Sequence, residues 1–279
     1  MAPQTLNLIL HLILAALYLP VLANLIQRRS GHETAATLLR IYVVLGVLLT
    51  IGEGLWRGGQ LRLATPRVAN DFQLYGATAL AFLLALTVAA FTRRNLRRWL
   101  ALGAFWVLGF ILILLNMLRL PAVIWTNGRL ALTLERLAPT WAIIGWLIFI
   151  VGAIFIARAA HARSRQPLFR NRLNYWTPVF LLTIINDILI IIGLPLPGNP
   201  VRLGEVALAA LIIITHDPPD LREVARRVLT YIITTIVIVV FYVAGFSASQ
   251  TVFKALPNFN PLLVGAGIAL LLSFIFTPL

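Results

Sequence analysis

The chain contains no cysteine, a single lysine and only nine acidic residues among its 279 residues. Without cysteine it can form no disulfide bond, thiol nucleophile or cysteine-ligated metal site. No two of its four histidines are predicted to face each other at matching depth, as a haem held by two imidazoles requires. No segment carries a nucleophile–base set, a phosphate-binding glycine loop or a catalytic pair of carboxylates. We therefore predict that this chain by itself is not an enzyme and holds no cofactor or metal.

Apolar sequence is what the chain has in abundance, at 60% of its residues. Near-uncharged stretches of about 18 to 22 residues recur, and a helix of that length crosses the hydrocarbon core of a bilayer. The sequence predicts an all-α, polytopic transmembrane bundle of about nine spans: 5–26, 35–56, 72–92, 99–118, 139–159, 175–194, 203–216, 228–247 and 260–277. The number falls to eight or seven if the first span or the short seventh one does not cross. We expect residues 1–279 to form one transmembrane domain, with the first stretch retained and not cleaved as a signal peptide.

The 23 basic residues are unevenly distributed over the connections between these spans. When alternate connections are grouped, one side carries 15 of the 23: Arg28, Arg29, Arg40, Arg93, Arg94, Arg97, Arg98, Arg158, Arg163, Arg165, Arg170, Arg172, Arg222, Arg226 and Arg227. Positive charge at span ends resists translocation, so this side is predicted to be cytoplasmic, with the N-terminus outside and the C-terminus inside. Such arginines contact anionic headgroups, so the net charge of +14 does not indicate a nucleic-acid partner. The expected location is the bacterial inner membrane.

Two further patterns bear on how the spans meet the bilayer surface. Aromatic residues cluster at the predicted interfaces, as an amphipathic belt requires: Trp56, Trp99, Trp125, Trp141, Tyr175 and Trp176. The longest outside connection, 119–138, carries leucines at 130, 132, 134 and 137. We interpret it as a loop with a piece lying on the membrane.

Three acidic residues are predicted inside or at the ends of spans, where an ionisable group is costly and calls for a function or a partner. Glu53, Asp187 and Glu205 are all expected at similar depth near the outside, close to Arg57 and Arg202. One interpretation is a ligand-binding pocket open to the outside, lined by Glu53, Arg57, Asn186, Asp187 and Glu205. The other is a set of interhelical hydrogen bonds or ion pairs, for example between Asp187 and Arg57. In both, Asp187 faces the interior of the bundle.

The connection 217–228 has the pattern of a helix start. Asp220 is placed to cap the first free amides, and Glu223 lies three residues further on, as in a capping box. Apolar residues then share one face and Arg222, Arg226 and Arg227 the other. This amphipathic pattern predicts an interfacial helix that leads into the eighth span and couples it to the seventh.

Several short motifs from residue 168 onward occur together in a known group of proteins. They are a basic Arg-x-Arg-Leu segment before a span with an aspartate, an Asp-Leu-Arg connection and an Arg-Arg-x-Leu-x-Tyr string, carried by Arg170, Arg172, Asp187, Asp220, Leu221, Arg222, Arg226, Arg227, Leu229 and Tyr231. In these motifs residues 168–279 resemble the multi-span N-terminal sensor region of bacterial histidine kinases and of related GAF-domain signalling proteins. The final Phe-Ile-Phe-Thr-Pro-Leu also looks like the last span of that region. The resemblance implies a module that passes a signal to a cytoplasmic output domain, which we expect to be absent from these 279 residues.

The function expected from this resemblance is that of a membrane-embedded sensor or anchor module of a signal-transduction protein, such as a two-component system. Two alternatives from other classes remain: an accessory transmembrane subunit of a respiratory or photosynthetic complex, and a small-solute transporter. The expected partners are the lipid bilayer and a second copy of the chain or a larger membrane complex.

Overall fold

The computed structural model describes residues 3–28, 31–57, 66–115, 122–126, 129–133, 137–215 and 218–224, together with Arg226 and Thr230. The chain forms two compact units, Met1–Pro218 and Pro219–Leu279. The predicted spans 228–247 and 260–277 lie outside the described residues, as does Arg227 of the predicted interfacial helix.

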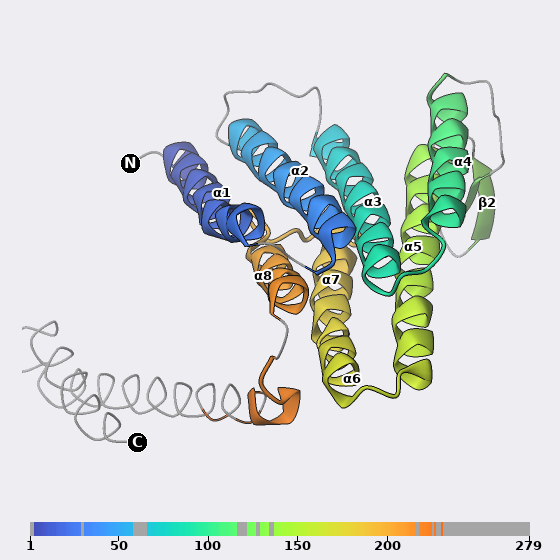
Figure 1. Cartoon of the computed structure of the whole chain (residues 1–279). Coiled ribbons are helices and arrows are strands. Elements are labelled where there is room, and N and C mark those ends of the chain that lie inside the picture. The colour runs from blue at the N-terminus through green and yellow to red at the C-terminus, as the bar shows by residue number, and fades with distance from the viewer. Residues whose placement is uncertain are drawn as a thin grey trace, which may run out of the picture. The chain divides into compact units, whose positions relative to one another are not determined.

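The first unit is a bundle of helices, as the sequence predicts (Figure 1). Its helices are α1 (Pro3–Gln27), α2 (Glu33–Arg57), α3 (Pro66–Phe91), α4 (Leu96–Leu114), α5 (Leu137–Arg163), α6 (Pro167–Asn174), α7 (Trp176–Ile191) and α8 (Pro200–Ile214). In the described part of the chain, six helical segments are long and apolar enough to cross a membrane, namely Asn7–Gln27, Glu33–Arg57, Asn70–Phe91, Leu96–Ile113, Leu137–Arg163 and Pro167–Ile191. These six coincide with the first six predicted spans, and the 15-residue α8 coincides with the seventh.

Helix α3 lies at the centre of the bundle, between α2 and α5 (Figure 1). One of its faces is a ladder of small residues at every fourth position, and each is at most 1% exposed: Ala77, Ala81, Ala85 and Ala89. Small side chains let neighbouring helix backbones approach closely, which is how apolar helices associate without help from the hydrophobic effect. The alanine ladder therefore explains why α3 is the most enclosed helix of the bundle.

Helices α4 and α5 are joined by two reciprocal hydrogen bonds, each from the indole of a tryptophan on one helix to the backbone carbonyl of a tryptophan on the other. The indole N–H of Trp106 donates to the carbonyl of Trp141 at 3.2 Å, and that of Trp141 donates to the carbonyl of Trp106 at 3.0 Å. Each ring lies where the other helix has a glycine: a Cβ added to Gly109 would come within 2.6 Å of Trp141, and one added to Gly145 would collide with Trp106. We call this arrangement the Trp–Gly clasp.

Contacts between helix ends show that successive long helices run in opposite directions. At one end, the start of α1 meets the end of α2 (His11 to Glu53, 3.6 Å), and the turn before α8 meets the same carboxylate (Asn199 to Glu53, 3.2 Å). We call this the Glu53 end. At the other end, Arg172 of α6 donates to the carbonyl of Ile212 near the end of α8 at 2.6 Å. This is the Arg172 end, and here also α2 begins and α3 ends. Such alternation is what consecutive membrane crossings require.

The structure departs from the sequence predictions in three local features. Within 119–138 it has an antiparallel hairpin, β1 (Ala122–Thr126) and β2 (Arg129–Thr133), with Ala122 opposite Thr133. The basic connection 158–174 contains the short helix α6, which starts with Pro167 at its first turn, where the missing N–H of proline costs nothing. Tyr175 and Trp176, assigned above to the interfacial belt, are 1% and 0% exposed. They pack inside the bundle because the α6–α7 junction folds back onto α3.

Candidate functional site

Asp187 lies inside the bundle at the Glu53 end, and both of its carboxylate oxygens accept hydrogen bonds, from residues of α5, α7 and α8. It is 3% exposed. Its Oδ1 accepts hydrogen bonds from Arg202 of α8 at 3.2 Å and from its neighbour Asn186 at 3.1 Å. Its Oδ2 accepts one from the indole N–H of Trp146 on α5 at 2.8 Å. The predicted inward orientation of Asp187 is therefore correct, and its ionic partner is Arg202 where Arg57 had been suggested.

Glu53 forms a second buried group at the same end of the bundle. Its Oε1 lies 2.7 Å from Nε of Arg57, one turn further along α2, and 3.6 Å from Nε2 of His11. Nδ1 of His11 lies 2.6 Å from the carbonyl of Asn7, so this nitrogen carries a proton. Nε2 can then donate to Glu53 only when the imidazole is doubly protonated. The close approach of α1 depends on Gly54, because a Cβ there would come 2.6 Å from Cβ of His11.

Glu205 extends the set of buried polar groups toward the middle of the helices. It is 1% exposed, and its Oε1 accepts a hydrogen bond of 2.6 Å from the hydroxyl of Tyr42 on α2. Tyr42 lies in the first half of α2 and Glu53 near its end. The buried polar groups of Glu53, Asp187 and Glu205 thus line the contacts of α8 with α1, α2 and α7.

The structure brings four residues of the predicted ligand set to one end of the bundle, in two separate groups: Arg57 with Glu53, and Asn186 with Asp187. The fifth, Glu205, lies nearer the middle of the helices, beside Tyr42. Asp187 and Glu53 pair with Arg202 and Arg57, as in the ion-pair interpretation, whereas Glu205 accepts one hydrogen bond from Tyr42 and its Oε2 has no hydrogen-bond partner among the described residues. Ligand binding here stays a prediction. Sequence reasoning missed His11, Tyr42 and Trp146 as members of the network. His11 could have been found, since its position in the outer half of the first span matches the depth of Glu53.

At the opposite end, Arg172 holds the last turn of α8. It is 4% exposed, and its Nε and Nη2 donate to the carbonyl of Ile212 at 3.1 and 2.6 Å. A helix ends in carbonyls without intrahelical donors, and a cation there satisfies them and interacts favourably with the helix dipole. The neighbouring Asn171 donates to the carbonyl of Pro218 at 3.0 Å. The basic segment that resembles the sensor family therefore contacts the point where the chain leaves the first unit.

The second unit is described from Pro219 to Val224 and at Arg226 and Thr230. Here the predicted helix start is confirmed: the carboxylate of Asp220 accepts a hydrogen bond from the N–H of Arg222 at 3.0 Å, and Val224 donates to the carbonyl of Asp220 at 3.1 Å. Arg222, Glu223 and Arg226 are exposed, in keeping with the polar face of an amphipathic helix.

Comparison of the chain with protein-family models, with curated proteins and with solved structures finds no match. The resemblance to the sensor region of histidine kinases therefore stays a prediction from the motifs.

Proposed function

We propose that the chain is a membrane-embedded sensor or anchor module of a bacterial signal-transduction protein, with about nine spans in the inner membrane. In this proposal the N-terminus is outside and the C-terminus cytoplasmic. A signal received at the Glu53 end changes the packing of α7 and α8, and the change passes to the helix that starts at Asp220. The stimulus can favour one packing only if it binds the two packings with different affinity.

One observation carries the proposal: α8 is tied to its neighbours by a buried arginine at each end. Arg202 at its start binds Asp187 of α7, and Arg172 of α6 binds the carbonyl of Ile212 near its end. Since α6 and α7 are consecutive, the two ties connect α8 to one continuous stretch of chain. A shift of α8 at the Glu53 end is therefore expected to move the whole helix and so to reach Pro218.

The proposed orientation is supported by the charge distribution together with the alternating helix directions. The connections at the Arg172 end carry Arg28, Arg93, Arg94, Arg163 and Arg165, whereas the connection between α7 and α8 at the Glu53 end carries no basic residue between Ile191 and Pro200. Because the chain lacks cysteine, single cysteines report orientation without background. We expect an impermeant thiol reagent to label Leu194→Cys in intact cells and to leave Arg165→Cys unlabelled until the membrane is opened. The opposite pattern would reverse the orientation.

Coupling between the two ends of α8 is tested with a reporter at the Asp220 helix. Arg222→Cys keeps the backbone N–H that Asp220 caps, and its side chain is exposed. In this background Asp187→Asn weakens the tie to Arg202, so the rate of thiol labelling at position 222 is expected to change about fivefold or more, the lower range of coupling between distant sites. The matched control is Asp71→Asn, the same substitution near the start of α3, outside the α7–α8 pair. An unchanged rate in a well-folded Asp187→Asn protein, or an equal change in the control, contradicts the sensor mechanism.

An accessory subunit of a larger membrane complex is the second candidate. The observation that favours it is the outward apolar face of α4, with Phe105 64% and Leu108 56% exposed. A lipid-facing helix has the same face, so purification in mild detergent decides. Stoichiometric migration with a large complex favours the subunit, and migration as a monomer or dimer favours the sensor module.

A further inference from the structure

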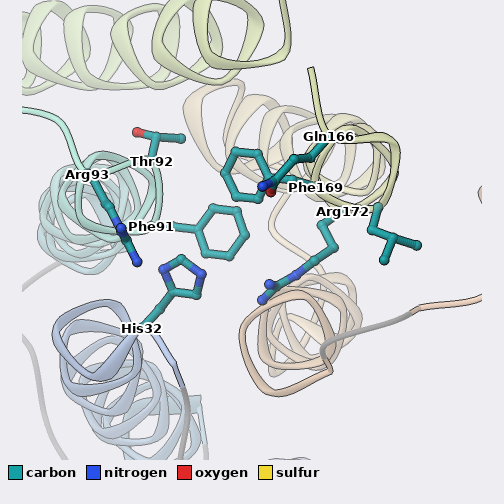
Figure 2. A pocket seen from close by; sticks show the side chains of 8 residues that line it. His32, Phe91, Thr92, Arg93, Gln166, Phe169 and Arg172 are labelled. Carbon is teal, nitrogen blue, oxygen red and sulfur yellow. The ribbon is translucent and has the colours of Figure 1, made fainter. Parts of the chain in front are cut away.

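A pocket of about 730 Å³ opens at the Arg172 end, between the start of α2, the end of α3 and α6. Figure 2 shows the rings of His32, Phe91 and Phe169 gathered at its centre, with Arg93 and Arg172 on either side. The ring of Phe91 lies 4.6 Å from that of His32 and is stacked at 5.6 Å on that of Phe169. The eight lining residues include two arginines, a histidine, a threonine and a glutamine, and no acid.

Arg93 adopts a backbone conformation that an arginine seldom takes. The N–H of Arg94 donates to the carbonyl of Ala89 at 2.8 Å, which closes α3 with a six-residue turn, and Arg93 within that turn has φ of 54°. This position is usually glycine, because a Cβ is disfavoured in the left-handed region. At the end of α7 the same turn, with Leu194 donating to Leu189, has Gly193 with φ of 79°. The strained position at α3 therefore points to a role for the arginine side chain itself.

The pocket offers cationic donors that the protein does not use. The side chain of Arg93 makes no hydrogen bond or ion pair with another described residue, and it is exposed. Arg172 binds Ile212 through Nε and Nη2, which leaves Nη1 outside that tie. Glu33, the nearest acid in the sequence to His32, binds Arg40 at 2.9 Å. Arginine presents planar donors that match the oxygens of a phosphate.

We propose that this pocket binds the headgroup of an anionic phospholipid. The phosphate lies between Arg93 and Arg172, and the first part of an acyl chain lies along Phe169 and Leu168. The location supports a lipid over a free anion, because the pocket is at the ends of apolar helices, where headgroups lie, and Leu168 is 56% exposed beside it. The proposal requires only that the helices span a membrane. Its further consequence, that a bound lipid touches the arginine that holds α8, rests on the proposed sensor function.

The test uses the purified full chain in a neutral detergent, with bound lipid counted by native mass spectrometry. We expect the chain to retain phosphatidylglycerol in preference to phosphatidylcholine. Arg93→Gly should lower retention of phosphatidylglycerol about fivefold, the effect expected of one arginine at an anionic membrane surface. Because glycine suits the backbone at this position, the thermal midpoint of the variant should not fall. The control is Arg97→Gln, an exposed arginine in the first turn of α4 that does not line the pocket, and it should change retention little.

Three results would overturn the lipid assignment. Equal retention of phosphatidylcholine would show that the phosphate charge is not recognised. Equal losses in Arg93→Gly and Arg97→Gln would show diffuse attraction to the arginines in place of a site. Displacement of phosphatidylglycerol by inorganic phosphate at the same concentration would show a site for the free anion. None of these measurements depends on signalling. The lipid proposal can therefore fail while the sensor proposal stands, and the sensor proposal can fail while the lipid proposal stands.

Discussion

The two ends of the bundle differ in how they accommodate charged side chains. At the Glu53 end, Asp187 and Arg202 are almost completely buried and satisfy each other, and Glu53 pairs with Arg57. At the Arg172 end the basic residues outnumber the acids, most are exposed, and a pocket lies among them. The difference is that the ions of the Glu53 end are paired inside the protein, whereas most of the described arginines at the Arg172 end are open to solvent.

The comparison predicts that loss of a cation costs most at the Glu53 end. Arg202→Met would leave the carboxylate of Asp187 buried with only Asn186 and Trp146 as donors, and breaking a buried pair in this way costs about 3–5 kcal/mol. The thermal midpoint of the full chain in detergent is expected to fall strongly. The double variant Asp187→Asn, Arg202→Met should recover much of the loss, because no unpaired charge remains. A small loss in the single variant would place water or lipid headgroups at Asp187 and erase the contrast between the ends.

The corresponding change at the other end should cost less. Arg172→Met frees the carbonyl of Ile212, but at a helix terminus beside an open pocket, where water can take the place of the guanidinium. A cation at a helix C-terminus contributes up to about 2 kcal/mol in partly buried geometry. The same thermal measurement should therefore show a smaller fall than Arg202→Met, and almost none for the exposed Arg170→Met on the same helix. A fall as large as that of Arg202→Met would mean that the two ties contribute equally to stability and would remove the contrast between the ends.

The placement of helices along the chain followed from sequence because length and apolar character decide it. The predicted span 35–56 corresponds to Glu33–Arg57, and 139–159 to Leu137–Arg163. The position of each acid along its helix followed for the same reason, and Glu53 and Asp187 do lie at the same end of the bundle, whereas Glu205 lies nearer the middle, beside Tyr42. The partner of Asp187 was not predictable, since an apolar helix shows little of the periodicity that reveals which face meets which neighbour. Which of Arg202 and Arg57 pairs with Asp187 depends on how α7 is rotated about its axis and on the course of the turn before α8.

Short elements were missed although they carry local signals. Residues 127–128 are Asn-Gly, the dipeptide most typical of a two-residue hairpin turn, between stretches that form β1 and β2. Pro167 marks the first turn of α6. Both lie in connections that were interpreted by polarity and charge, and polarity distinguishes a loop from a span but not a loop from a hairpin. The coupling role of Asp220 stays a prediction, while its cap was foreseeable because capping needs only neighbours in sequence.

The Trp–Gly clasp has a consequence for how this sequence can diverge. Each indole fits only because the opposite helix has no side chain at that level, as a Cβ at Gly109 would come within 2.6 Å of Trp141. A larger residue at Gly109 is therefore tolerated only with a smaller one at 141, and the same holds for Gly145 with position 106. Each tryptophan and its opposing glycine should therefore covary, so that homologous chains either keep both residues or replace both.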